Sequence, residues 1–121
     1  MTLPRLSARR GALLALALAG LAVMAAAPAA EARKSCGKIV NPYPDSEYEG
    51  IDLKRIRAQG VACKKARRVT RGAHRKALRG PLPPDGIRRL KWHGWKVRGN
   101  LIPDHDRYRA RRGNRRVRWI F

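Results

Sequence analysis

The most informative stretch of the chain is RYRARRGNRRVRWIF, residues 107–121. Its Gly113-Asn114 pair is a two-residue turn signal, with glycine at the first central position as a type II′ turn requires. A hairpin folded about this pair opposes Ala110 to Val117, Tyr108 to Trp119 and Asp106 to Phe121. We therefore predict a C-terminal β-hairpin with one largely apolar face.

The other face of this hairpin is predicted to be cationic, because the same register sets Arg109 against Arg118 and Arg111 against Arg116. Upstream, Trp95-Lys96-Val97-Arg98 alternates apolar and basic residues, which is typical of a half-buried strand that would extend both faces. We call the expected cationic surface the arginine face; its members are Lys96, Arg98, Arg107, Arg109, Arg111, Arg116 and Arg118.

A helix is predicted over Val61 to Arg79, where small apolar residues recur every three or four positions before Gly80-Pro81 ends the pattern. The stripe consists of Cys63, Ala66, Val69, Ala73 and Ala77. Cys36–Val40 and Ile51–Ala58 are further candidate strands, the second with a bulge near Lys54-Arg55. We therefore expect an α+β fold, with one amphipathic helix on a small, mostly antiparallel sheet of three to five strands.

Residues 1–32 are predicted to be a secretory signal peptide. Its N-terminal signal helix is expected to be either cleaved off or disordered. Three arginines precede an apolar run of 17 residues, Gly11 to Ala27, and Ala30-Glu31-Ala32 forms a small-residue cleavage site. A membrane anchor is the alternative, although the run is short for a span of about 20 residues. The pair Arg9-Arg10 before the apolar run is compatible with twin-arginine export as well as with general secretion, so both routes stay open. We expect cleavage after Ala32 and an extracytoplasmic location.

Residues 33–121 form one small basic domain in this interpretation. The whole chain has 29 Lys and Arg against 8 Asp and Glu, a net charge of +21, and loss of three arginines and Glu31 leaves +19. Its two cysteines, Cys36 and Cys63, are expected to form a disulfide in an oxidising compartment. A reactive thiol pair is the alternative, but no C-x-x-C spacing supports it.

The segment IRAQGVACKKARRV, residues 56–69, resembles a pattern found in small secreted cysteine-containing proteins of high-GC, actinobacterial-type bacteria. In that pattern an apolar-x-Ala strand end leads into a Cys-x-x-Ala-Arg helix start. Gly94-Trp95 before a basic terminal hairpin is also similar. Many members have two further cysteines, where this chain has Val97 and Tyr108 or a neighbour. The resemblance implies a small secreted α+β domain and no established activity.

The arginine face predicts a partner of negative charge. Like charges opposed across strands destabilise a sheet, and Lys64, Arg67, Arg71 and Arg75 repeat the conflict along the predicted helix. A bound polyanion would relieve this repulsion, and arginine forks match phosphate and carboxylate oxygens. The candidates are a cell-surface polymer, nucleic acid or anionic lipid, bound non-specifically. A merely solvated surface, rich in arginine through GC-rich coding, gives the same pattern.

Other segments leave further alternatives open. A small protein-interaction or inhibitor module could use the loop Pro81–Gly86. Trp92 is either a core residue at the rim or an exposed platform for bases or sugars. The acidic stretch Asp45–Asp52 is expected to fold over part of the arginine face and neutralise it.

The sequence does not predict an enzyme. Asp104-His105-Asp106 is the one constellation that resembles a metal or general-base site, and we expect it in the loop after Pro103. His74 is predicted on the helix and His93 beside the tryptophan-containing strand, so the histidines do not converge. We therefore predict no catalytic residue, no metal site, no cofactor and no small-molecule substrate.

Overall fold

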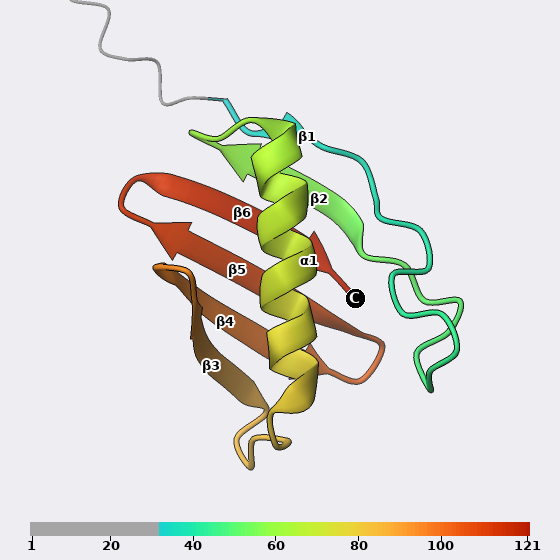
Figure 1. The fold of residues 1–121 in the computed structure, drawn as a ribbon. Helices are drawn as coiled ribbons and strands as arrows, with labels where there is room; N and C mark the ends of the chain where they lie inside the picture. Colours follow the sequence, from blue (N-terminus) through green and yellow to red (C-terminus); the bar gives the residue numbers. More distant parts are fainter. Residues whose placement is uncertain (1–31) are drawn as a thin grey trace, which may run out of the picture.

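The computed structural model describes residues 32–121, which fold into one helix packed against a six-stranded antiparallel sheet (Figure 1). The predicted signal peptide lies, apart from Ala32, outside the described residues. The strand order across the sheet is β1-β2-β6-β5-β4-β3. The elements are β1 (Lys34–Ser35), β2 (Lys54–Gln59), α1 (Cys63–Arg79), β3 (Ile87–Trp92), β4 (Trp95–Ile102), β5 (His105–Arg112) and β6 (Arg115–Ile120).

The predicted C-terminal hairpin is present in the predicted register. Ala110 pairs with Val117 and Tyr108 with Trp119, and the backbones of Asp106 and Phe121 exchange two hydrogen bonds. Gly113 has a φ of 59°, the left-handed conformation that a type II′ turn needs at its first central residue. The alternation of buried and basic residues in the two strands, together with the turn signal between them, is thus sufficient to fix β5 against β6.

The α+β class is confirmed, with a larger sheet than the three to five strands expected. The strand predicted over Cys36–Val40 is wrong: β1 ends at Ser35, and beyond it the chain has only backbone hydrogen bonds of Cys36 and Gly37 with Ile56 and a single bridge between Ile39 and Leu53. β2 begins at Lys54, and the register of its pairing with β6 shifts between Lys54 and Arg57, which confirms the predicted bulge. Arg55 has a φ of 49° at this point.

β3 is a strand that the sequence did not predict, and it joins β4 through the turn His93-Gly94. Both turn residues have positive φ, 45° and 80°, as in a type I′ turn. The residue types of β3 lack the apolar–polar alternation expected of a half-buried strand. The exception is Arg88, which occupies a position on the covered side of the sheet and is only 9% exposed.

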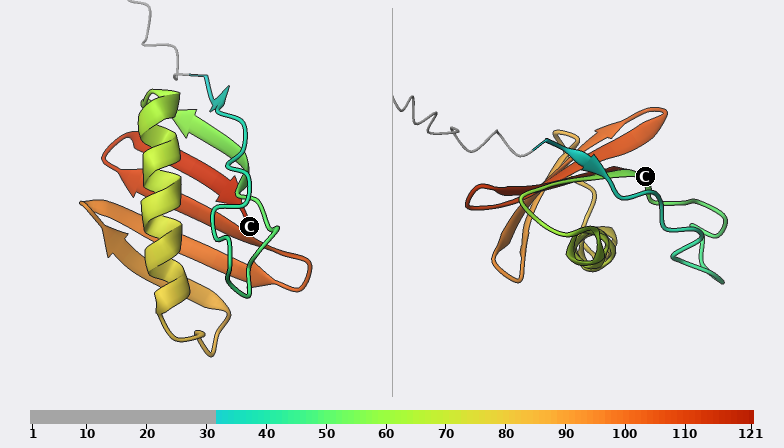
Figure 2. Two further views of the ribbon diagram at one scale, coloured as in Figure 1. Left: turned by 45° about the vertical axis from the view of Figure 1, so that its right-hand side comes forward. Right: turned by 90° about the horizontal axis from the view of Figure 1, so that it is seen from above.

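The helix confirms the predicted stripe, although it begins at Cys63 rather than Val61. Figure 2 shows α1 on one side of the sheet only, so that the opposite side of the sheet has no layer over it. We call the covered side the inner side and the other the outer side. The buried core between helix and sheet includes Val69 and Ala73 from α1 and Trp95, Val117 and Trp119 from the sheet.

Two glycines allow aromatic rings to lie directly against backbone. A Cβ placed on Gly72 of α1 would come 2.1 Å from Cζ2 of Trp92, and one on Gly99 of β4 would come 2.4 Å from Cε1 of Tyr108. Trp92 is therefore a rim residue of the core, packed on the helix, and not an exposed platform for stacking. No helix within residues 32–121 has the length and hydropathy to span a membrane.

Candidate polyanion-binding face

The arginine face occupies the outer side of the sheet. Its residues alternate along β4, β5 and β6 with buried residues such as Val97, Tyr108, Ala110 and Val117. Because successive side chains of a strand point to opposite faces, the basic residues project away from the helix. All seven residues that the sequence placed on this face lie on one side of the sheet.

Pairing across the sheet arranges the basic residues in rows that cross the strands. One row runs from β2 to β3 through Arg57, Arg118, Arg109, Arg98 and Arg89, each paired directly with the next. The neighbouring row contains Gln59, Arg116, Arg111, Lys96 and Lys91. Adjacent strands are about 4.8 Å apart, so the first row sets five guanidinium side chains over about 19 Å.

Few carboxylates compensate these charges. Within residues 32–121 there are two ion pairs, Lys38 with Asp52 at 3.8 Å and Arg89 with Asp85 at 3.1 Å between nitrogen and oxygen. Only the second pair touches a row, at its β3 end. Partial burial, and then the charges of Arg33, Arg109 and Arg116, lower the pKa of Arg118. The centre of the face is thus a site where added positive charge is unfavourable and a bound anion is favourable.

Two hollows mark the centre of the outer side. One, of about 290 Å³, is lined by both strands of the β5–β6 hairpin and by Lys96 and Arg98 of β4. The other, of about 410 Å³, lies toward the opposite end of the same strands and includes Arg55, Arg57 and Asn100. Arg109 and Arg118 line both hollows, which makes them the central residues of the face.

The sequence missed the contribution of β2 and β3 to this surface. Arg57 joins the row through the pairing of β2 with β6, two segments separated by the whole helix and three other strands. Arg89 and Lys91 join through β3. The turn His93-Gly94 between two tryptophans was the local signal for β3, whereas no local signal announces a pairing as distant as that of β2 with β6.

The acidic stretch Asp45–Asp52 does not cover the arginine face, so that expectation is wrong. Figure 2 shows this segment on the same side of the sheet as the helix. Tyr43 and Tyr48 anchor it there against the ring of Phe121, with ring centroids 5.9 and 5.6 Å away. Aromatic packing on the inner side therefore holds this segment away from the arginine face.

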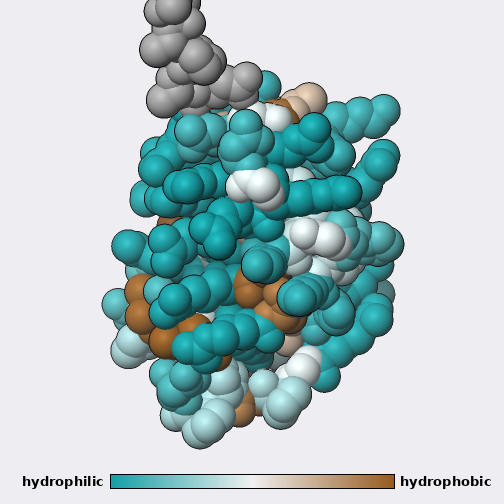
Figure 3. All heavy atoms as spheres, turned by 90° about the vertical axis from the view of Figure 1, so that its left-hand side faces the viewer, coloured by the Kyte–Doolittle hydropathy of each residue, from teal (hydrophilic) through white to brown (hydrophobic). Residues whose placement is uncertain are grey.

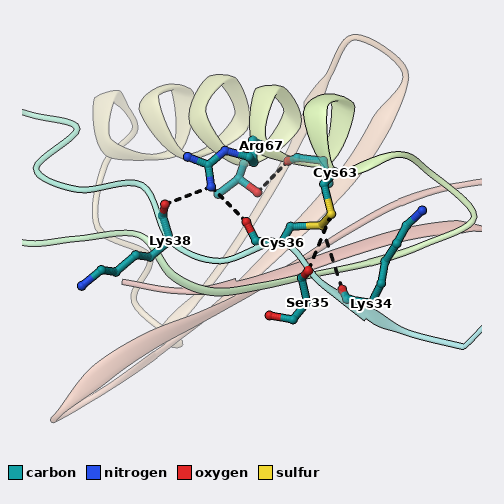
Figure 4. The surroundings of a disulfide bond; sticks show 8 residues. Lys34, Ser35, Cys36, Lys38, Cys63 and Arg67 are labelled. Carbon is teal, nitrogen blue, oxygen red and sulfur yellow. Dashed lines mark hydrogen bonds between the residues drawn. A yellow bond between two sulfur atoms is a disulfide. The ribbon is translucent and has the colours of Figure 1, made fainter.

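The predicted disulfide links Cys36 to Cys63, across a sequence separation of 27 and a Cα–Cα distance of 5.2 Å (Figure 4). It ties the segment after β1 to the first residue of α1. Nearby, Nη1 of Arg67 donates hydrogen bonds of 2.9 Å to the carbonyl oxygens of both Cys36 and Lys38. Arg67 is thus a structural residue, in contrast to its expected place among the repelling charges of the helix.

The constellation Asp104-His105-Asp106 is not a loop as expected, because β5 begins at His105. Nε of Arg107 donates a 3.1 Å hydrogen bond to Nε2 of His105. His74 lies on α1 and His93 in the turn after β3, so the three histidines occupy different elements. Among residues 32–121 there is no group of three or more His, Cys, Asp or Glu side chains placed to hold a metal ion.

His74 instead belongs to the buried core, where it is 0% exposed. Its Nδ1 shares a 2.6 Å hydrogen bond with the hydroxyl of Tyr43, and its ring lies 4.9 Å from that of Tyr108. Burial, and then the charge of Arg88, lower the pKa of His74 to about 3, while burial raises the pKa of Tyr43 to about 12. Both groups are therefore neutral at pH 7.

The loop Pro81–Gly86 borders an open cavity of about 640 Å³, with the end of α1 and with β3 forming its other walls. Leu82 at this loop is 77% exposed. Figure 3, which views the β3 side of the molecule, shows a mainly hydrophilic surface with small hydrophobic patches. The loop thus offers limited apolar area beside a much larger basic surface.

Comparison of the chain with protein-family models, curated proteins and solved structures gives no match.

Proposed function

We propose that this protein is a secreted, non-enzymatic domain that binds polyanions non-specifically through the arginine face. The observation that carries the proposal is the row Arg57, Arg118, Arg109, Arg98 and Arg89, which sets like charges directly opposite one another on five strands. Such a row weakens the sheet unless anions lie over it. Candidate ligands are cell-surface polymers, nucleic acid and anionic lipid.

Non-specific binding follows from the side chains that the outer side presents. Guanidinium forks fit phosphate or carboxylate oxygens, and the tryptophans that could stack on bases lie on the inner side. Contacts of this kind release counterions, so affinity falls linearly with salt on logarithmic axes, with a slope of about −0.7 for each phosphate contact on a single strand.

The test compares two pairs of substitutions in the same hairpin. Arg109→Gln/Arg118→Gln removes the central charges of the outer side, whereas Arg112→Gln/Arg115→Gln removes the same charge from another pair near the turn. With a fluorescent single-stranded oligonucleotide as probe, we expect the first variant to lose about one to two units of salt slope and the control to keep nearly the parental value. Equal effects of both pairs would contradict a face-specific site.

Secretion is proposed on the signal-peptide features of residues 1–32, and the disulfide is compatible with an extracytoplasmic location. The resemblance to small secreted proteins of high-GC bacteria supports the same location. Expression of the full chain in a secreting actinobacterial host should release a product whose N-terminal residue is Arg33. A retained Met1 in the membrane fraction would show that the apolar run is an anchor.

The alternative function is a small interaction or inhibitor module that uses the loop Pro81–Gly86, and the exposed Leu82 beside the 640 Å³ cavity favours it. A contact of this kind would persist at a salt concentration that abolishes polyanion binding, and Leu82→Ser would weaken it. The two functions are therefore distinguished by salt, which abolishes polyanion binding and leaves the loop contact in place.

A further inference from the structure

A second cationic surface runs along the exposed side of α1. Lys64, Arg68, Arg71, Arg75 and Arg79 are all exposed and follow one another at intervals of three or four residues. Residues at this spacing lie above one another on a helix, so the five form a continuous row, which we call the helix row. With a rise of 1.5 Å per residue it is about 22 Å long. The helix contains no acidic residue.

The helix row and the arginine face point in opposite directions. α1 lies on the inner side of the sheet, as the view from above in Figure 2 shows, and its buried residues face the core. The helix with its side chains is about 10–12 Å thick, and the sheet adds to this distance. The two surfaces are therefore farther apart than the Debye length of about 8 Å at physiological ionic strength.

This separation has a consequence for binding. Anions bound to one surface are screened from anions bound to the other, so occupation of the first does not repel occupation of the second. Between the surfaces lies an apolar core that includes Val69, Ala73 and Trp119, through which no ligand can pass. Each surface thus has its own electrostatic environment and can hold its own segment of polymer.

We propose that the protein is bivalent: the helix row is a second binding surface, and one molecule bridges two segments of a phosphodiester polymer. This inference rests on the proposed polyanion binding at the arginine face. One strand of a double helix has one charge about every 3.4 Å, so a stacked strand offers an anion to each cation of either surface. The basic residues of both surfaces contact the backbone of the polymer, and its bases or other substituents stay unread.

The experiment uses single-stranded DNA of eight nucleotides, about 27 Å long at the 3.4 Å per nucleotide of a stacked, duplex-like strand. Such an oligonucleotide covers one surface but is too short to cover both. The full domain, residues 33–121 with its disulfide, is titrated at about 0.1 M salt, where the Debye length is about 10 Å and the two surfaces are screened from each other. A mixture of donor- and acceptor-labelled oligonucleotides reports ternary complexes by energy transfer. We expect two oligonucleotides per protein, and energy transfer at saturation.

Two matched variants each remove four charges. One is Lys64→Gln/Arg68→Gln/Arg71→Gln/Arg75→Gln on the helix, and the other is Arg98→Gln/Arg109→Gln/Arg116→Gln/Arg118→Gln on the sheet. Glutamine is a good helix former and its introduction removes repulsion between like charges, so the helix variant should keep its circular dichroism spectrum and melt no lower than the parental protein. We expect either variant to bind one oligonucleotide instead of two and to lose the energy transfer. The parental protein should also bridge long DNA into aggregates that scatter light, and neither variant should do so.

The possible results separate the two proposals. One oligonucleotide per parental molecule, lost in the sheet variant and kept in the helix variant, overturns bivalency and leaves the proposed function standing. No binding to the parental protein overturns both. Aggregation of phosphatidylglycerol vesicles without bridging of DNA overturns the phosphodiester assignment in favour of a membrane. A stoichiometry of two that survives the helix substitutions shows that the helix row is not the second surface.

Discussion

His74 is a titratable residue whose role is decided by its surroundings. In the sequence it is one of three histidines that a catalytic site could recruit, yet the fold places it in the core with its ring against Phe121, at a centroid distance of 4.2 Å. Burial disfavours its charged form, which lowers its pKa to about 3. A neutral, fully buried imidazole contributes to stability, and its contribution depends on pH.

The sign of this pH dependence follows from the pKa of His74 in the unfolded chain, 6.5, and its pKa in the folded protein, about 3. Below about pH 6.5 the unfolded chain binds a proton on His74, whereas the folded protein does so only near pH 3. The contribution of His74 is therefore complete above pH 6.5 and is lost as the pH falls, by about 1.4 kcal/mol per pH unit. We expect the free energy of unfolding in urea to fall by about 2 kcal/mol from pH 6.5 to 5 through this residue.

His74→Gln tests the assignment, because it keeps a polar side chain near Tyr43 and removes the titration. The pH dependence between 6.5 and 5 should become correspondingly shallower. His93→Gln is the control, since His93 is exposed in the turn after β3. An unchanged slope in the His74 variant would show that other groups cause the loss of stability in acid.

At the scale of elements, the contact between α1 and β3 depends on the absence of a side chain at Gly72. Alanine is favoured over glycine within a helix by about 1 kcal/mol. Here the added Cβ would overlap the indole of Trp92, at 2.1 Å from Cζ2. Overpacking of this kind costs about 1–3 kcal/mol, so we expect Gly72→Ala to lower the free energy of unfolding by about 1 kcal/mol.

Introducing Gly72→Ala into a Trp92→Leu variant separates the effect of helix propensity from the effect of overlap with the indole ring. In Trp92→Leu the ring is gone, and Gly72→Ala should there be neutral or stabilising, as helix propensity alone requires. The measurement is a double-mutant cycle by thermal or urea unfolding. A stabilising effect of Gly72→Ala in the parental protein would mean that Trp92 moves aside at little cost.

The elements also show which parts of the fold can be predicted from the sequence. The β5–β6 register, the helix stripe and the bulge at Lys54-Arg55 are encoded by residues close together in the chain, and they are confirmed. β3 was missed because Arg88 interrupts its alternation, and the pairing of β2 with β6 was missed because it is not local. The seven residues of the arginine face were found on one side because the pleat alone determines which way they point.

At the scale of the whole molecule, a covalent link limits the freedom of the unfolded chain. The disulfide between Cys36 and Cys63 closes a loop of 27 residues, which on the chain-entropy account stabilises the fold by about 3–4 kcal/mol. A domain of about 90 residues has a small core, so this amount is a large part of its expected stability.

We therefore expect Cys36→Ser/Cys63→Ser to lower the free energy of unfolding by about 3 kcal/mol and to raise sensitivity to protease. The control is the parental protein unfolded with and without reductant, which should reproduce the difference without any substitution. If the variant and the parental protein unfold at the same urea concentration, the disulfide adds no stability, and the pairing of β1 with β2 together with the hydrogen bonds of Arg67 is sufficient to hold this segment.

The alternation along β5 also bears on how such a protein can evolve. Tyr108 and Ala110 serve the core, while Arg107, Arg109 and Arg111 are free of it. Odd-numbered positions can therefore drift, and with them the preference for a ligand, while even-numbered positions keep the fold. Insertion or deletion of one residue in β5 would exchange the two sets at once, so substitutions are tolerated here and changes of length are not.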